Sequence, residues 1–200
     1  MGGTTRTLAA ELSLNVGSEA TLCGWVHRVR DLGKVCFVVL RDRSGVAQVV
    51  LEANPGVTPE SVVRATGTVV ANPKAPGGAE LQAKSLDVVA AAAPDLPIAV
   101  NQEPDKLSLE AILDNRMLTL RNPQILSIFR VQHTILAAFA DHLRSEGVTE
   151  IKTSKLIGTG TEGGTGLFAV DYFDTKMYLT QSPQLYKQAM VASGLERVFE

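Results

Sequence analysis

Residues 24–50 have the sequence GWVHRVRDLGKVCFVVLRDRSGVAQVV, and this stretch decides the fold of the first half of the chain. Runs of valine, leucine and aromatic residues alternate in it with two short polar segments, Asp-Leu-Gly and Asp-Arg-Ser-Gly, which are typical of tight turns. Branched and aromatic residues favour strands. The stretch therefore predicts three consecutive strands that form a meander, near residues 20–28, 34–41 and 46–52.

Two further segments, residues 63–71 and 80–89, have the same strand-forming composition. Before them, Thr58, Pro59 and Glu60 resemble a helix start, with a cap, a first-position proline and an acidic first turn, and they predict a short helix. Three strands, a helix and two strands within about 90 residues are typical of the five-stranded oligonucleotide-binding (OB) β-barrel, whose open face binds single-stranded nucleic acid. We expect this domain to span residues 1–95.

The composition changes after this segment. Residues 90–107 contain three prolines and little periodicity, so we expect a linker at residues 96–122. Asn122 and Pro123 begin a long amphipathic helix, which Gly147 ends. Its apolar stripe consists of Ile125, Ile128, Phe129, Leu136, Phe139 and Leu143. A strand at 150–157, a glycine-rich loop, two strands around FAVDYF and KMYLTQ, and a helix capped by Ser182 predict a second domain at residues 123–200.

The overall composition is that of an ordinary globular protein. The 200 residues include 19 basic and 21 acidic side chains, with a formal net charge of −2. No apolar run approaches the roughly 18 residues of a membrane span, and the N-terminal residues lack the pattern of a signal peptide, so we expect a cytoplasmic protein. Cys23 and Cys36 lie among apolar residues without metal-ligand spacing, and we expect no metal site.

The predicted barrel carries a local basic segment. Between Arg28 and Arg43 there are five basic residues and two acidic ones. On one face of the barrel, Phe37 would stack on a base, the amide of Gln48 would read a base edge, and the guanidinium of Arg30 would hold phosphate. The alternative is a core phenylalanine and a surface glutamine, and alternation does not decide between them because both faces of the Phe37 strand are apolar.

The glycine-rich loop has two interpretations. Gly158, Gly160 and Gly163 match the GxGxxG pattern of dinucleotide sites, but a strand is predicted after them where that fingerprint requires a helix. A nicotinamide dehydrogenase is therefore not favoured. What remains is a loop with one carboxylate, Glu162, which is either a solvated acid or part of a ligand site.

The helix after the loop offers a second polar group. Ser182 and Pro183 are explained by a helix start alone. Gln184 and Lys187, three residues apart, share one helix face. Together with Glu162 they would suit a small zwitterion, with the lysine facing a carboxylate and the glutamate an ammonium.

These segments together resemble the aspartyl-tRNA synthetases. GWVHRVRDLGKVCFVVLRDRSGVAQVV is similar to their anticodon-binding barrel, and TEGGTGLF and QSPQLYKQAMVASGLERVFE resemble the flipping loop and aspartate pocket of these class II enzymes. The short EGGT loop is similar to the archaeal-type branch. The resemblance covers residue 6 to the last residue and implies an OB-fold barrel followed by the start of an α+β class II catalytic domain, an antiparallel sheet with helices.

The resemblance also implies roles for individual residues. The anticodon would be bound by Arg30, Phe37, Gln48 and Glu80. The aspartate pocket would be formed by Glu162, Ser182, Gln184, Leu185, Tyr186 and Lys187. Residues 123–155 resemble motif 1, which makes the homodimer interface, although Ser154 stands where the family has proline.

The resemblance places the reaction in a longer protein. The segment LERVFE is similar to the lead-in to motif 2, whose arginine grips the ATP phosphate, so we expect motifs 2 and 3 to lie beyond Glu200. The parent enzyme would join L-aspartate to tRNA with ATP and Mg²⁺. The 200 residues would hold no catalytic residue and would be inactive alone.

Two barrel residues bear on the choice of tRNA. Archaeal-type enzymes restricted to tRNA(Asp) tend to carry Trp at the position of His27 and Lys at the position of Pro76, whereas relaxed enzymes resemble this sequence at both positions. The resemblance therefore implies aspartylation of both tRNA(Asp) and tRNA(Asn). The alternatives are that His27 merely ends a strand and Pro76 shapes a loop. A stand-alone barrel that binds single strands would leave QSPQLYK unexplained.

Overall fold

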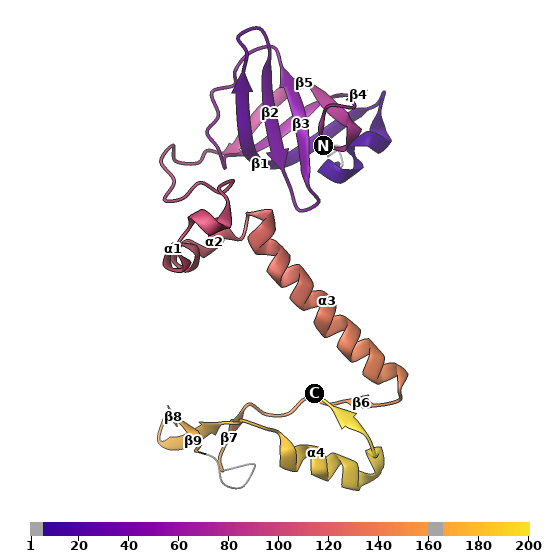
Figure 1. Cartoon of the computed structure of the whole chain (residues 1–200), viewed down its shortest axis with the longest axis vertical. Coiled ribbons are helices and arrows are strands. Elements are labelled where there is room, and N and C mark those ends of the chain that lie inside the picture. The colour runs from indigo at the N-terminus through magenta and orange to yellow at the C-terminus, as the bar shows by residue number, and fades with distance from the viewer. Residues whose placement is uncertain (1–5, 160–165) are drawn as a thin grey trace. The chain divides into compact units, whose positions relative to one another are not determined.

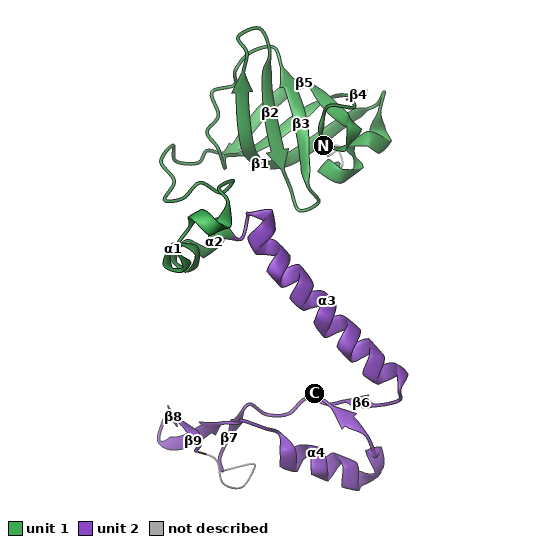
Figure 2. Cartoon of the chain, in the orientation of Figure 1, with its two compact units in different colours: residues 1–119 green, residues 120–200 purple. Residues whose placement is uncertain are grey.

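The computed structural model describes residues 6–159 and 166–200. By their internal contacts the residues form two units, Met1–Thr119 and Leu120–Glu200, which Figure 2 shows in different colours. The sequence places the second domain at residue 123 after a linker, whereas the border between the units lies at residue 120. No helix in the described ranges is long and apolar enough to cross a membrane.

Five strands form the closed barrel that the sequence predicts (Figure 1). They are β1 (Glu19–Asp31), β2 (Cys36–Arg41), β3 (Val46–Leu51), β4 (Val62–Ala71) and β5 (Ala79–Ala90), in the order β1-β2-β3-β5-β4. All neighbouring pairs are antiparallel except β3 with β5, which run parallel. This topology confirms the predicted OB-fold.

Successive side chains of each strand point alternately into the barrel core and toward its outer surface. Val38, Val49 and Val63 point inward and are fully buried, as is Cys36. Burial is the main cause that raises the pKa of the Cys36 thiol, and the charge of Asp31 adds to it. Both cysteines are free. A 3-10 helix, η1 (Ala9–Asn15), adds Ala9 and Leu12 to this core.

The predicted short helix after Thr58 is wrong. Residues 58–61 form a turn, in which the Ser61 N–H donates to the Thr58 carbonyl at 3.2 Å. Glu60 has a left-handed backbone, with φ at 66°, and its N–H donates to the carbonyl of Val26 on β1 at 2.7 Å. The hydrogen bond to β1 therefore overrides the local helix-start pattern. Helix propensity alone does not predict this outcome, because the partner strand lies far away in the sequence.

The segment after the barrel belongs to the first unit. Ile98 and Val100 are buried, and the short helices η3 (Pro104–Lys106), α1 (Leu109–Asp114) and α2 (Arg116–Thr119) follow. The Ser108 hydroxyl caps α1 by accepting from the Ala111 N–H at 3.1 Å. Part of the predicted linker is thus packed structure.

The second unit begins with the long predicted helix, α3 (Pro123–Ser145). Asn122 caps it by accepting from the Gln124 N–H at 2.9 Å, and Gly147 follows its end with φ at 73°. Its apolar stripe is only partly covered: Ile125 is buried, and Phe139 packs edge-on against Phe199 at 6.3 Å between ring centroids.

Short strands and one further helix complete this unit. Strands β7 (Leu156–Ile157), β9 (Thr175–Leu179) and β8 (Phe168–Tyr172) form an antiparallel sheet, and β6 (Thr149–Glu150) pairs in parallel with β10 (Val198–Phe199). The single strand predicted at 150–157 is therefore two strands with a break around Ser154. Helix α4 (Gln184–Met190) continues into a π-helical turn, η4 (Val191–Leu195).

Gly67 allows β4 and β5 to approach closely at a bulge. A Cβ atom there would lie 2.7 Å from the Ala83 Cα and would overlap the Gln82 carbonyl, so one strand must shift. We predict that Gly67→Ala lowers the free energy of unfolding of the barrel by about 1–3 kcal/mol. Urea unfolding followed by circular dichroism measures it. Gly158→Ala, whose Cβ would meet nothing within 4 Å, is the matched control; equal stability of both variants would contradict the prediction.

Candidate functional site

The barrel gathers the four predicted anticodon residues on its outer surface, here called the Phe37 face: Arg30, Phe37, Gln48 and Glu80. Phe37 pairs with Arg30 on β1 and with Val50 on β3, while Gln48 pairs with Glu80 on β5. Because Cys36 and Val38 fill the core, Phe37 between them points outward and is partly exposed. The structure thus resolves its orientation, which the sequence left open.

Three side-chain amides surround the Glu80 carboxylate. Gln48 Nε2 and Asn72 Nδ2 donate to Oε2 at 2.8 and 2.7 Å, and Gln82 Nε2 donates to Oε1 at 2.8 Å. Glu80 is only 8% exposed, and these donors replace the water that it loses. Each donating amide leaves its own carbonyl oxygen for other partners. The face therefore presents fixed polar groups next to an aromatic ring.

The sequence did not identify Asn72 and Gln82. Gln82 lies two residues after Glu80 on one strand face, which is a detectable pattern. Asn72 has no such signal, because it reaches Glu80 across the connection between β4 and β5. Its N–H also donates to the Gly78 carbonyl at 2.9 Å, which closes the loop that carries Pro76 in η2 (Pro76–Gly78). Asn72 therefore ties the Pro76 loop to the Phe37 face.

His27 belongs to a different group, the Arg41 cluster, which consists of Trp25, His27, Arg41 and Glu60. Arg41 Nη2 donates to both Glu60 oxygens, at 2.9 and 2.7 Å, and Nη1 lies 2.9 Å from His27 Nδ1. The guanidinium carbon lies 5.8 Å from the centre of the Trp25 ring. The side chains of Arg41 and Glu60 are 7% and 4% exposed. Sequence reasoning missed both, since their partners lie far away in the chain.

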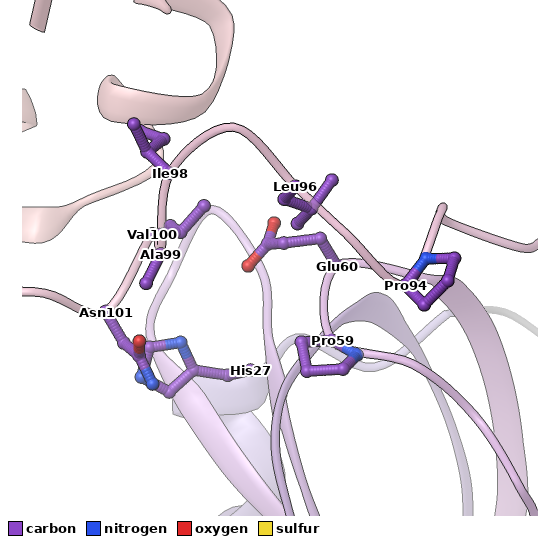
Figure 3. Close-up of a pocket in the computed structure, with 9 residues that line it drawn as sticks. All are labelled: His27, Pro59, Glu60, Pro94, Leu96, Ile98, Ala99, Val100 and Asn101. Carbon is purple, nitrogen blue, oxygen red and sulfur yellow. The ribbon is translucent and has the colours of Figure 1, made fainter. Parts of the chain in front are cut away.

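His27 occupies a β-bulge of β1. The pairing with β2 shifts register between Val26 and Arg28, which leaves His27 as the extra residue. Burial, followed by the positive charge of Arg41, lowers the pKa of the imidazole below its ordinary 6.5, while Glu60 acts in the opposite direction. The imidazole lines a cavity of about 220 Å³, and Figure 3 shows the side chains around it. Its lining residues are His27, Pro59, Glu60, Pro94, Leu96 and 98–101.

The second unit brings three of the predicted aspartate residues together. Ser182, Gln184 and Lys187 line one cavity of about 460 Å³, with Gln188, Val191 and Ala192. Leu185 and Tyr186 lie on α4 but are not among its lining residues. Glu162 lies outside the described residues. The helix cap is Pro183, not the predicted Ser182.

Two families match successive parts of the chain. Residues 20–89 match the OB-fold nucleic acid binding domain, and residues 108–200 match the class II tRNA synthetases of the D, K and N group. An aspartate–tRNA(Asp/Asn) ligase of Haloferax volcanii is 45% identical over 92% of this chain, and one of Thermus thermophilus is 44% identical over 98%. Over nearly its whole length the chain is similar to class II aspartyl-tRNA synthetases. It spans about half the length of these relatives, 45% and 46%.

Solved structures agree with this assignment. An asparaginyl-tRNA synthetase from Pyrococcus horikoshii, complexed with asparaginyl-adenylate, matches 99% of the chain and 47% of its own length, with a TM-score of 0.83 and 32% identity. A putative aspartyl-tRNA synthetase from Leishmania major Friedlin matches 100% of the chain and 43% of its own length, with a TM-score of 0.88 and 27% identity. A stand-alone barrel is therefore not favoured, because the synthetase family includes the second unit.

The lowered pKa of His27 predicts a pH dependence of stability. The unfolded chain protonates near the ordinary value of about 6.5, whereas the folded imidazole binds its proton only at lower pH. The stability contribution is thus complete above pH 6.5 and is lost as the pH falls through the folded pKa.

We therefore expect the free energy of unfolding of the wild type to fall more between pH 7.5 and 5 than that of His27→Asn, which removes the titrating group. Denaturant unfolding at several pH values measures this difference. Parallel pH profiles of the two proteins would contradict the depressed pKa. His133→Asn, on the exposed face of α3, is the control.

Proposed function

We propose that this chain is the N-terminal part of an aspartate–tRNA ligase that activates L-aspartate with ATP and transfers it to tRNA. The observation that carries the proposal is the Phe37 face, where an aromatic ring, an arginine and an amide-bound carboxylate lie together on an OB-fold barrel. The relatives named aspartate–tRNA(Asp/Asn) ligases support it, as does the cavity lined by Ser182, Gln184 and Lys187.

In this proposal the Phe37 face binds the anticodon. Phe37 stacks on an unstacked base, because single-stranded RNA exposes its bases to aromatic side chains. Gln48, held by Glu80 through Nε2, offers its carbonyl oxygen and second N–H to a base edge. Arg30 is exposed beside Phe37 and pairs with a backbone phosphate.

Replacing Phe37 tests the anticodon role. We predict that Phe37→Ala weakens binding of a tRNA(Asp) anticodon stem-loop by about 1–3 kcal/mol through the lost base stack. Arg30→Ala should in addition reduce the salt dependence of binding, since it removes one phosphate contact. Leu14→Ala, 83% exposed on η1, is the control. A titration that gives the same affinity for wild type and Phe37→Ala would exclude Phe37 from the interface.

The aspartate site is proposed in the α4 cavity. Lys187 attracts a substrate carboxylate, and Gln184 and Ser182 add hydrogen-bonding groups beside it. Leu185 and Tyr186, which the resemblance also assigns to aspartate, lie on α4 outside the lining of this cavity. Glu162 is proposed to face the substrate ammonium. A cation and an anion in these roles would suit a small zwitterion.

ATP and Mg²⁺ belong to the complete enzyme in this proposal. Class II aminoacyl-tRNA synthetases use ATP and a divalent metal ion. In the described parts of this chain, no three His, Cys, Asp or Glu side chains gather as a metal site. We therefore assign no residue of this chain to Mg²⁺ and derive no step through it. We propose the cytoplasm as the compartment, where tRNA is charged for translation.

Both tRNA(Asp) and tRNA(Asn) are proposed as substrates, because His27 and Pro76 match the relaxed pattern and the relatives are named for both tRNAs. We predict that the full-length enzyme aspartylates both transcripts at similar kcat/KM. Charging assays with radioactive aspartate measure this. A preference for tRNA(Asp) above about a hundredfold, or about 2.7 kcal/mol, would contradict relaxed recognition. No charging of either tRNA would overturn the ligase proposal itself.

A homodimer through residues 123–155 is also proposed. Helix α3 exposes Ile128, Ile135 and Phe139 by 63%, 62% and 57%, a row of apolar side chains on a long helix. We predict that the chain sediments as a dimer and that Ile135→Glu shifts it to monomer by placing a charge in the interface. Gln132→Glu adds the same charge at a polar position and is the control. A monomeric wild type at micromolar concentration would contradict the interface.

A further inference from the structure

One carboxylate holds the irregular segment between β6 and β7. Glu200 Oε1 accepts from the Thr153 N–H at 2.9 Å and from the Lys155 ammonium at 2.6 Å. Its other oxygen, Oε2, accepts from the Thr153 hydroxyl at 2.7 Å. We call Thr153, Lys155 and Glu200 the Glu200 clamp. Because Thr153 and Lys155 flank Ser154, the clamp fixes the chain on both sides of that residue.

The clamp is a set of charge-assisted hydrogen bonds. The Glu200 side chain is 11% exposed, and its donors replace the water that it loses. The Lys155 ammonium, followed by the Thr153 N–H and hydroxyl, lowers the pKa of the Glu200 carboxyl to about 2. The carboxylate is therefore charged at neutral pH. The Ser154 hydroxyl, in contrast, donates to the Leu156 carbonyl two residues further on, a bond that stays within the segment.

The clamped segment is bonded to the proposed aspartate site. The Lys155 carbonyl accepts from the Thr180 N–H at 3.0 Å, directly after β9, which pairs with β7. The Thr180 hydroxyl donates to the Ser182 carbonyl at 3.1 Å, and Ser182 lines the α4 cavity. A continuous chain of contacts therefore leads from Glu200 to the lining of the cavity.

We propose that Glu200 is a positioning residue for the aspartate cavity, which it reaches through Lys155 and Thr180. The proposal rests on the proposed aspartate site. Glu200 is not among the residues that line the cavity, so its effect is on the place of Ser182 and the start of α4. The strength of a hydrogen bond depends on distance and angle, and a small displacement of these groups therefore weakens the hold on the substrate.

Kinetics of the full-length enzyme test the positioning role. Glu200→Ala should raise KM for aspartate by about 3–10-fold, because the groups that bind it are less well placed. KM for tRNA should change by less than about 2-fold, since tRNA contacts are made elsewhere. Asp171→Ala, which removes an exposed carboxylate on β8, is the matched control. An unchanged KM for aspartate, or equal rises for aspartate and tRNA, would overturn the proposal.

A conservative variant keeps the test valid if Glu200→Ala does not fold. Glutamine retains one acceptor oxygen for the Thr153 N–H but loses the charge that attracts Lys155. Glu200→Gln should therefore raise KM for aspartate less than Glu200→Ala does and more than the Asp171 control. A folded Glu200→Gln enzyme with the KM of the wild type would show that the charge has no part in positioning.

Proline at residue 154 tests whether Glu200 acts through this segment. Proline restricts the backbone without any bond to Glu200, and the resemblance places a proline at this position. Added to Glu200→Ala, Ser154→Pro should return KM for aspartate to within about 2-fold of wild type, because the segment is rigid again. A folded double variant without any recovery would show that Glu200 does not act through residues 153–155.

Amide hydrogen exchange follows the same contacts without substrate. In the 200-residue chain, Glu200→Ala should speed exchange of the Thr180 N–H by about 3–10-fold, since its acceptor is the Lys155 carbonyl. The Leu126 N–H, bonded to the Asn122 carbonyl at 2.9 Å in α3, is the reference and should not change. Equal acceleration at both amides, or none at Thr180, would contradict the proposed path.

The outcomes separate this proposal from the function on which it rests. If the full-length wild type does not exchange pyrophosphate into ATP with aspartate, the aspartate site is wrong and the positioning role falls with it. If the wild type activates aspartate and Glu200→Ala keeps the same KM, the aspartate site stands and the role of Glu200 is wrong.

Discussion

The parallel pairing of β3 with β5 closes the barrel, and the arrangement of the Phe37 face depends on it. This pairing sets Gln48 opposite Glu80, two residues that are 32 positions apart in the chain. The same register turns Val49 and Leu81 into the core, so the polar pair must lie outside. A shift of one residue would exchange the two faces and bury the amide and the carboxylate without their partners. Closure therefore fixes both the core and the proposed recognition surface.

The Arg41 cluster places a second constraint on the barrel. Burying two charges is costly, and their attraction in the interior roughly offsets that cost, so the pair contributes more to geometry than to net stability. Removing one partner alone leaves an isolated buried charge, which costs about 3–5 kcal/mol. The pair joins the end of β2 to the turn before β4, and through His27 it also reaches the bulge in β1. Three elements are thereby held at one end of the barrel.

Much of the fold follows from local sequence patterns, but the finer geometry of the site does not. The turns after Asp31 and Asp42 and the alternation in β2 and β3 predict the strands, because these signals lie within a few residues of each other. Phe37 remained ambiguous until the register showed that its neighbours fill the core. The helix predicted at Glu60 failed because its backbone and carboxylate bond to β1 and β2, far away in sequence.

Long-range contacts also explain why some site residues could not be predicted from the sequence. Asn72, Arg41 and Glu60 act through single contacts across the barrel, which leave no periodicity in the chain. In the second unit, Ser182, Gln184 and Lys187 were predictable together because they lie within two turns of one segment. The assignment of Leu185 and Tyr186 rests on resemblance alone, since neither lines the cavity.

The position of Trp25 gives the barrel an optical probe of its own. It is the single tryptophan of the chain, and the Arg41 guanidinium lies over its ring at 5.8 Å. The emission of an indole depends on charges near its ring, so a movement of Arg41 changes the fluorescence of Trp25 without any added label. Ligand binding near His27, or loosening of the Arg41–Glu60 ion pair, can therefore be followed in solution and in real time from the emission spectrum of Trp25.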